Sequence, residues 1–285
     1  MKLALGTAQF GLDYGIANQQ GQIPSVEVKN ILAKAKSGGL DTLDTAISYG
    51  NSEACLGEVG VSDWKVISKL PAIPDECGDI FEWVSDSVND SLQRLNVNNL
   101  YGLLLHRPQQ LLELNGEELF NALEKVKKSG LIQKIGVSIY DPSELDELCS
   151  RFPIDIVQAP FNIIDRRMID SGWMVHLNEK KIELHIRSVF LQGLLLMDSE
   201  SRPRNFDRWS SLWDKYDAWL EQSNLTSLQA CLRYVLSFPE IDKIVIGVDS
   251  QNHLEEILKA SKGAIPPLSD SFGVDDMQLL NPACW

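Results

Sequence analysis

The sequence predicts an α/β fold, a (β/α)8 TIM barrel, and three observations support this. Short runs rich in β-branched residues and leucine alternate with longer segments of helical period, the pattern of repeated strand–helix units over a parallel sheet. Eight such units fit in the 285 residues, and a barrel of this kind takes about 250. No linker or low-complexity tract interrupts the alternation. A doubly wound open sheet is the alternative architecture.

The boundaries of the expected elements follow from local sequence signals. The eight expected strands are residues 3–6, 42–45, 65–69, 100–106, 135–138, 156–159, 182–188 and 244–247. Helices are expected to begin where a capping side chain or a proline precedes the helical period, namely at Ser25, Asn51, Asp79 and Asp141 with Pro142. Two helices are expected to end at Gly38 with Gly39 and at Gly130, because glycine readily adopts the left-handed conformation that stops a helix.

The whole chain, residues 1–285, is expected to form a single domain. Two segments depart from the regular alternation: an insertion after the seventh strand, from Asp198 to about Asn224, and a tail from Gly263 to Trp285. In a barrel, both segments would lie at or near the mouth.

Composition and charge exclude several classes of protein. The net charge of −14 repels phosphate backbones, so nucleic acids and anionic membrane surfaces are not expected as partners. The five scattered cysteines include no C-x-x-C pair and are interpreted as free thiols of a cytoplasmic protein. The amino-terminal apolar stretch is too short for a signal peptide, and no run approaches the ~20 residues of a membrane span. We expect a monomer or a weak homo-oligomer.

Four residues of different chemistry fall at or just after the ends of neighbouring expected strands. They are Asp44, Tyr49, Lys69 and His106. Because barrel active sites are built from these positions, the four side chains are expected to converge. A buried ammonium stabilises a phenolate, and a carboxylate keeps that ammonium charged, so a tyrosine beside such a pair is suited to donate a proton near neutral pH. Each residue alone has an ordinary structural interpretation, as a loop cap, a packing ring, a strand end or a core histidine.

The chain resembles the aldo-keto reductase superfamily along nearly its whole length. The resemblance rests on eight segments in order: LGTAQFG (5–11), LDTAISYGNSEACLG (43–57), ISKL (67–70), LLLHRP (103–108), IQKIGVS (132–138), VQAPFN (157–162), SVFLQGLL (188–195) and VIGVDSQNHLEE (245–256). It implies a barrel that transfers a hydride between a nicotinamide and an aldehyde, a ketone or the corresponding alcohol. The family's catalytic tetrad falls on Asp44, Tyr49, Lys69 and His106. Tyr49 would be the general acid/base, Lys69 and Asp44 would tune it, and His106 would orient the carbonyl.

The same resemblance implies a set of nicotinamide-nucleotide contacts: Thr7, Asp44, Ser138, Gln158, Arg187, Ser188, Phe190, Gln192, Gly193, Gly247, Asp249, His253 and Glu256. Within this set, Ser138 and Gln158 match the pair that holds the carboxamide, and the segment around Ser188 matches the loop that receives the pyrophosphate. Three departures stand out. Ile139 replaces a frequent Asn, Phe161 replaces a frequent Tyr, and Arg187 occupies the position where many members stack an aromatic ring on the nicotinamide.

The choice between NADP(H) and NAD(H) depends on residues 247–253. This segment offers no Lys or Arg for the 2′-phosphate, so a charge-assisted bidentate contact is missing there. Ser250, His253 and backbone amides remain as donors. NADP(H) is therefore placed only slightly ahead of NAD(H), on family habit.

The substrate is expected to be a small carbonyl compound, sugar-like or anionic. Arg202, Arg204 and Arg208 lie close together in the insertion and suit an anionic group. Against this, the aromatic residues between Trp209 and Leu220 recur at helical spacing, which favours a buried helix face with the arginines as ion-paired neighbours. Phe272 and Trp285 are further candidates for the mouth, and no histidine pair has metal-ligand spacing.

Two other functions remain open from the sequence. In the first, Lys69 forms a Schiff base in a barrel aldolase or isomerase, which requires a lowered lysine pKa. Asp44 beside it favours the charged lysine instead. In the second, the barrel binds the nucleotide as a regulatory or sensor protein without turnover. The complete tetrad counts against this second alternative.

Overall fold

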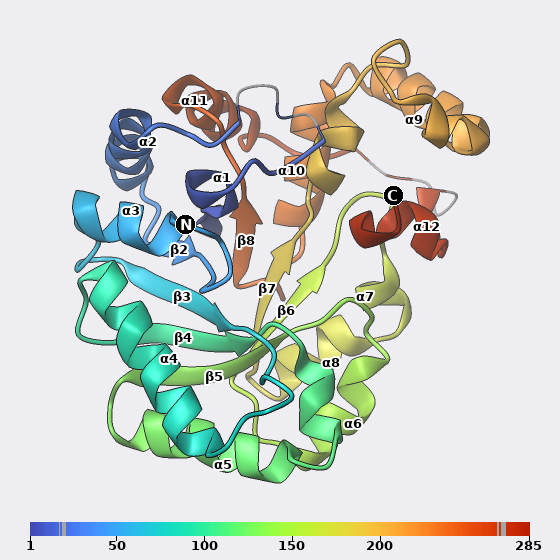
Figure 1. Cartoon of the computed structure of the whole chain (residues 1–285). Coiled ribbons are helices and arrows are strands. Elements are labelled where there is room, and N and C mark those ends of the chain that lie inside the picture. The colour runs from blue at the N-terminus through green and yellow to red at the C-terminus, as the bar shows by residue number, and fades with distance from the viewer. Residues whose placement is uncertain (17, 19–20, 267, 269–271) are drawn as a thin grey trace.

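The computed structural model describes residues 1–16, 18, 21–266, 268 and 272–285. Its eight parallel strands close into one barrel in the order of the sequence, and β8 pairs with β1. The strands are β1 (Leu3–Gly6), β2 (Thr42–Asp44), β3 (Lys65–Leu70), β4 (Leu100–Leu105), β5 (Ile132–Ser138), β6 (Ile156–Pro160), β7 (Glu183–Arg187) and β8 (Lys243–Ile246). The predicted (β/α)8 barrel is confirmed, and the open sheet is excluded (Figure 1).

Helices alternate with the strands and surround the barrel (Figure 1). The α-helices are α1 (Ala8–Gly11), α2 (Ser25–Ser37), α3 (Ser52–Val59), α4 (Ile80–Leu95), α5 (Gly116–Lys128), α6 (Glu144–Arg151), α7 (Arg167–Asp170), α8 (Trp173–Glu179), α9 (Ser210–Ser223), α10 (Ser227–Leu236), α11 (Gln251–Ala260) and α12 (Met277–Leu280). Short 3-10 helices are η1 (Pro108–Leu112), η2 (Leu191–Leu196), η3 (Arg204–Trp209) and η5 (Pro282–Cys284).

The helix ends follow the sequence signals with two corrections. Asp141 and Pro142, expected to begin a helix, lie in the turn before α6, which begins at Glu144 with Ser143 in the cap position. Asp79 caps α4, its Oδ1 accepting the N–H of Glu82 at 2.9 Å. Gly39 and Gly130 have φ angles of 85° and 84°, the left-handed conformation expected at these stops. Ser25, expected as a cap, is instead the first helical residue of α2, because the extended Pro24 holds the cap position.

The interior of the barrel is packed, which leaves space only at its end. Ile67, Leu104 and Ile156 form a separate apolar cluster inside the sheet. Gly136 makes room for it, since a Cβ there would come within 2.4 Å of Cδ2 of Leu104 and 2.5 Å of the Ile156 carbonyl oxygen. Below this cluster, Glu183 accepts hydrogen bonds from Tyr101 and Lys134. A ligand therefore has to approach from the mouth.

The insertion after β7 forms η3 and α9, and it packs as the aromatic spacing predicted. Trp213 and Tyr216 are buried. Arg202 forms a salt bridge with Asp217 at 2.7 Å, so it is an ion-paired neighbour of this buried face.

The tail corrects the expectation for its two aromatic residues. Phe272 packs edge-on against Trp219 with ring centroids 5.7 Å apart, and Trp285 packs against Phe206 at 5.0 Å. Both therefore cover the insertion, and neither lines the pocket described below.

None of the helices in the described part of the chain is both long and apolar enough to cross a bilayer. The five cysteines are free thiols, and Cys231 is fully buried.

Candidate active site

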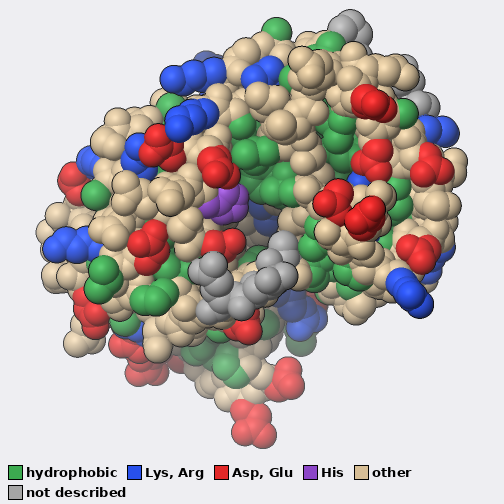
Figure 2. Space-filling view, turned by 90° about the horizontal axis from the view of Figure 1, so that it is seen from above, with side chains coloured by type: hydrophobic (Ala, Val, Ile, Leu, Met, Phe, Trp, Pro, Cys, Tyr) green, Lys and Arg blue, Asp and Glu red, His purple; other side chains and the backbone are tan. Residues whose placement is uncertain are grey.

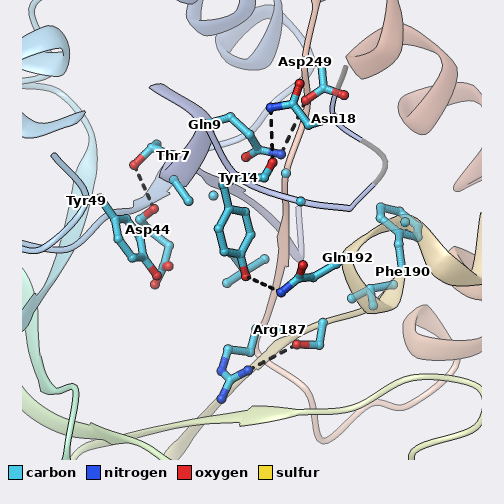
Figure 3. Close-up of a pocket in the computed structure, with 18 of the residues that line it drawn as sticks. Thr7, Gln9, Tyr14, Asn18, Asp44, Tyr49, Arg187, Phe190, Gln192 and Asp249 are labelled. Carbon is cyan, nitrogen blue, oxygen red and sulfur yellow. Dashed lines mark hydrogen bonds between the residues drawn. The ribbon is translucent and has the colours of Figure 1, made fainter. Parts of the chain in front are cut away.

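A pocket lies at the carboxyl ends of the strands and receives residues from both ends of the chain. Most of the predicted site residues line it: Thr7, Asp44, Tyr49, Gln158, Arg187, Ser188, Phe190, Gln192, Gly193, Gly247, Asp249 and His253. Figure 3 shows Tyr49 and Asp44 on one side of it and Arg187, Gln192 and Phe190 on the other. Seen from above, the molecule is hollowed near its centre, with hydrophobic and histidine side chains around the visible hollow (Figure 2).

A chain of hydrogen bonds crosses the inner end of the pocket. Lys69 donates from Nζ to Oδ1 of Asp44 at 2.5 Å and to the Thr45 carbonyl oxygen at 3.0 Å. The second carboxylate oxygen of Asp44 accepts from Nε2 of Gln158 at 2.7 Å, and Oε1 of Gln158 accepts from the Ser138 hydroxyl at 3.1 Å. The four side chains of this hydrogen-bond chain, those of Lys69, Asp44, Gln158 and Ser138, are all buried, so each one fixes the orientation of the next.

Lys69 is charged in this setting. Its side chain is 1% exposed, and burial alone would lower its pKa. The negative charge of Asp44 and the hydrogen bond to it outweigh that effect, so the pKa of Lys69 is raised above its ordinary value. A buried ammonium therefore lies at the base of the pocket at neutral pH.

Tyr49 and His106 lie above this ion pair. The Lys69 ammonium is 5.1 Å from the ring centroid of Tyr49, and the His106 ring stands edge-on to Tyr49 at 6.0 Å. Burial lowers the pKa of His106 to about 4, and the positive charge of Lys69 adds to this effect. His106 is therefore neutral at pH 7, with Nδ1 3.3 Å from the Ser48 hydroxyl. In the neutral state the ring can orient a carbonyl by a hydrogen bond.

The backbone around Tyr49 is held by a close approach of two loops. A Cβ on Gly11 would lie 1.9 Å from the Tyr49 carbonyl oxygen, so only glycine fits there. Gly50 has a φ of 51°, and a Cβ added to it would lie 2.4 Å from the Gly11 carbonyl oxygen, so a side chain does not fit there either. Thr7 completes the contact, because both its N–H and its hydroxyl donate to the Asp44 carbonyl oxygen, at 2.9 and 3.1 Å.

The segment after β7 carries an unusual concentration of left-handed backbone. Ser188, Leu191 and Gln192 have φ angles of 61°, 47° and 53°, and Gly193 follows at 95°. Each non-glycine residue in this region costs roughly 1–3 kcal/mol, and such strain persists mainly at ligand sites that the surrounding fold holds in place. Asn162 contributes by donating from Nδ2 to the Ser188 carbonyl oxygen at 3.0 Å. Ser188, Gln192 and Gly193 of this turn line the pocket.

The outer rim of the pocket lies after β8. Asp249 accepts at Oδ1 from Nε2 of Gln9 at 3.5 Å, and its N–H donates to Nδ1 of His253 at 3.4 Å. A Cβ on Gly247 would lie 2.8 Å from Nε2 of Gln9, so glycine lets the first and last loops meet. Among the described residues that line the pocket, this rim contributes a carboxylate and a histidine and no Lys or Arg.

Comparison with known proteins identifies the family. The family model described as the Aldo/keto reductase family matches residues 2–272. The chain belongs to this family. It is 25% identical to the aldo-keto reductase YhdN of Bacillus subtilis over 206 residues, covering 68% of this chain and 60% of that protein. It is 24% identical to the NADH-specific methylglyoxal reductase of Escherichia coli over 224 residues, covering 68% of this chain and 65% of the relative. The chain thus spans less than two thirds of the length of these relatives.

Solved structures agree on the fold. An aldo-keto reductase of Bacillus halodurans in a holo form superposes with a TM-score of 0.73 at 19% identity, covering 95% of this chain and 89% of that one. A glycerol dehydrogenase of Gluconobacter oxydans superposes with a TM-score of 0.71 at 20% identity, covering 95% and 88%.

Four of the predicted residues do not line the pocket. Three of them, Lys69, His106 and Ser138, take part in the contacts described above, and the fourth is Glu256. Glu256 is exposed on α11 and does not line the pocket. Gln9 and Tyr14 line it without having been predicted; the Tyr14 hydroxyl lies 3.5 Å from Nε2 of Gln192, and burial raises the pKa of Tyr14. Both follow β1, so the rule that barrel sites form after strand ends points to them. No group of three or more potential metal ligands occurs in the described part of the chain.

Proposed function

We propose that the protein is an NAD(P)(H)-dependent aldo-keto reductase in which Tyr49 is the general acid/base. The observation that carries this proposal is the buried Lys69–Asp44 pair beneath Tyr49 and beside a neutral His106. An ammonium near a phenol favours its ionised form, so the energetic cost of giving up the proton falls. The substrate would be a small aldehyde or ketone, or the alcohol in the reverse direction.

The residues of the pocket fit a nicotinamide nucleotide. Gln158 and Ser138 offer an amide and a hydroxyl at the inner end, which suit a carboxamide. The turn from Ser188 to Gly193 lines one wall of the pocket with left-handed backbone, a conformation that can direct successive N–H groups at a pyrophosphate. Thr7 and Phe190 complete the inner and outer parts of this path. Bound there, the nucleotide would supply or accept the hydride.

The remaining chemistry belongs to this chain's own side chains. Tyr49 would donate its hydroxyl proton to the carbonyl oxygen. Lys69 would stabilise the resulting phenolate, while Asp44 and the Thr45 carbonyl oxygen hold the ammonium in place. His106, being neutral, would hydrogen-bond the carbonyl oxygen and fix its orientation without competing for the proton. Because Lys69 keeps its proton at neutral pH, it is poorly suited to attack a carbonyl as a Schiff-base nucleophile.

Within this proposal, NADP(H) is preferred over NAD(H) by a small margin. His253 and Ser250 provide donors for a 2′-phosphate, whereas Asp249 on the same rim repels it and can accept a hydrogen bond from a free 2′-hydroxyl. The discrimination between the two nucleotides should therefore be small. Separate titrations with NADPH and NADH, followed by energy transfer from the tryptophans to the reduced nicotinamide, measure it directly.

The experiment that tests the function is the Tyr49→Phe variant with carbonyl reduction and nucleotide affinity measured side by side. We expect kcat to fall by about 10²–10⁴-fold while the nucleotide Kd changes little, because only the proton donor is removed. Tyr101→Phe is the matched control, since it removes a tyrosine hydroxyl from the opposite end of the barrel. Unchanged turnover in Tyr49→Phe would remove Tyr49 from the mechanism.

Two outcomes would instead favour the alternatives. If the protein binds a nucleotide but oxidises it with no carbonyl in a broad panel, a regulatory or sensor function gains support. If it binds neither nucleotide but is inactivated by borohydride in the presence of substrate, with label on Lys69, the barrel is an aldolase or isomerase.

A further inference from the structure

We propose that Asn162 is a positioning residue for nucleotide binding, which holds the turn after β7 in the shape that receives the pyrophosphate. The inference rests on the proposed function, because it takes this turn as part of the nucleotide site. Asn162 follows β6, its side chain is fully buried, and it is not among the described residues that line the pocket. It acts through another residue, Ser188, which follows β7 and does line the pocket.

The first observation is how the Asn162 amide is held. Its Oδ1 accepts from the N–H groups of Ile164 and Asp165, at 3.0 and 2.9 Å, so one end of the amide is fixed within the loop after β6. The other end reaches the neighbouring strand, where Nδ2 donates to the Ser188 carbonyl oxygen at 3.0 Å. Because the amide is planar and one end is bonded twice, its donor has little freedom to leave Ser188.

The second observation is where this contact lies in the sheet. β6 and β7 pair in register as far as Pro160 and Arg187, and the Phe161 N–H donates to the Arg187 carbonyl oxygen at 3.1 Å. The regular pairing ends there, because Ser188 has a φ of 61°, outside the range of an extended strand. The Asn162 side chain therefore joins the two loops immediately beyond the end of the strand ladder.

The third observation is that the conformation of Ser188 needs support. A left-handed φ at a residue other than glycine costs free energy, so Ser188 would relax toward extended backbone unless its surroundings held it. Its carbonyl oxygen accepts from the Asn162 amide and from the Leu191 N–H, each at 3.0 Å. The Leu191 bond is internal to the turn and moves with it. The Asn162 bond, in contrast, ties the turn to the loop after β6.

The shape of this turn decides where its backbone donors lie. Ser188, Val189 and Phe190 line the pocket, and none of their N–H groups has an acceptor in the described part of the chain. Successive N–H groups of this kind can bind the oxygens of a pyrophosphate. A change of φ at Ser188 rotates the peptide groups that follow it, so it would move these donors relative to the rest of the pocket.

The test compares Asn162→Ser with a control, Gln110→Ala. Serine keeps an oxygen that can accept from the N–H groups of the local turn, but its side chain is too short to reach Ser188. Gln110 is a buried amide that bonds the Ile73 N–H and carbonyl oxygen in loops at the same end of the barrel, and it is not among the described residues that line the pocket. Urea unfolding shows whether each variant is folded, and Kd for NADPH and NADH and kcat at saturating nucleotide are measured for each.

In Asn162→Ser, the Kd of each nucleotide that the wild type binds should rise by about 5- to 30-fold, because the turn is no longer held. Where both bind, the factor should be the same, since the pyrophosphate is common to them. At saturating nucleotide, kcat should fall by less than about threefold, because the proton donor and its ion pair are unchanged. Gln110→Ala should be less stable and keep the wild-type Kd values. Unchanged Kd values in Asn162→Ser, or an equal rise in Gln110→Ala, would overturn the inference.

A second measurement asks whether Asn162 acts through the backbone of Ser188. Glycine adopts a left-handed φ without steric cost, so in a Ser188→Gly background Asn162→Ser should raise the Kd by less than about threefold. An equal rise in both backgrounds would overturn the inference. If Asn162→Ser does not fold, Asn162→Asp takes its place in both comparisons, because aspartate keeps the acceptor of the local turn and lacks the donor.

A failure of the proposed function is recognised separately. A wild type that binds neither nucleotide would overturn the proposed function, and this inference with it. A wild type that binds a nucleotide, together with an Asn162 variant of unchanged Kd, would overturn the inference alone.

Discussion

Replacing Lys69 by Met should destabilise the fold far more than an ordinary charge removal. The Lys69 and Asp44 side chains are 1% and 6% exposed, so the substitution leaves a carboxylate in the protein interior without its cation. Among the described residues, the carboxylate would keep only the hydrogen bond from Nε2 of Gln158. Removing one partner of a buried pair typically costs ~3–5 kcal/mol of unfolding free energy. In the double variant Asp44→Asn/Lys69→Met the loss should be clearly smaller than the sum of the single losses, because no lone charge is left.

The assay is urea unfolding followed by circular dichroism and tryptophan fluorescence. Lys65→Met is the matched control, because Lys65 lies on the same strand and also forms a salt bridge, with Asp41. Its side chain is 48% exposed. A pair this exposed contributes about 0–1 kcal/mol, so the control should unfold close to the wild type. If Lys69→Met loses less than about 1 kcal/mol, or if the two single losses simply add, the account of a coupled buried pair is wrong.

Three further predictions concern other parts of the site and its support. Glu53→Gln should lower the unfolding free energy by ~1–3 kcal/mol in a urea titration, because the buried carboxylate accepts charge-assisted hydrogen bonds from Arg94, which is itself 37% exposed and can be solvated when the charge is removed; a loss within error of zero would contradict this. In an NMR titration, the pKa of His106 should be about 4 in the folded protein, against 6.5 in the unfolded chain. The neutral His106 therefore contributes roughly 3 kcal/mol to the unfolding free energy, which is fully present above pH 6.5 and is lost as the pH falls through 4. A measured pKa near 6.5 would refute the burial effect. Gly11→Ala should lower both the melting temperature and kcat, because its methyl group would displace the Tyr49 backbone, and unchanged values of both would show that the loops can separate.

The fold was predictable because barrel strands carry their signal locally. Runs such as residues 3–6 are buried on both faces, so they read as continuous apolar stretches. The predicted strand boundaries were wrong where a strand residue pairs with a side chain from a strand far away in the sequence. β5 begins at Ile132 and not at residue 135, because Lys134 faces Glu183 and Tyr101 inside the barrel. A single sequence does not indicate that Lys134 pairs with Glu183 of a distant strand, so the beginning of this strand could not be predicted.

The site was predictable to the extent that strand ends and family motifs mark it. The neighbouring positions of Asp44 and Lys69 follow from the pairing of β2 with β3, which any parallel barrel of this order produces. The contact of Tyr14 with Gln192 does not follow, because it depends on the path of a loop and on left-handed backbone at Gln192. The prediction that Glu256 contacts the nucleotide was wrong because it rested on the family motif alone. Glu256 lies within a matching segment, but the helical period of α11 places its side chain on the exposed face.

The pairing of β1 with β8 has a consequence for how the protein is made. Leu5 is the register partner of Ile246, and Gln9 and Asp249 are hydrogen-bonded to each other across the rim of the pocket. During synthesis, β1 emerges from the ribosome long before β8. The edge of β1 that pairs with β8 therefore stays uncovered for nearly the whole of synthesis. We expect nascent chains that end before residue 243 to stay dependent on chaperones, and the pocket to be among the last features to form after release.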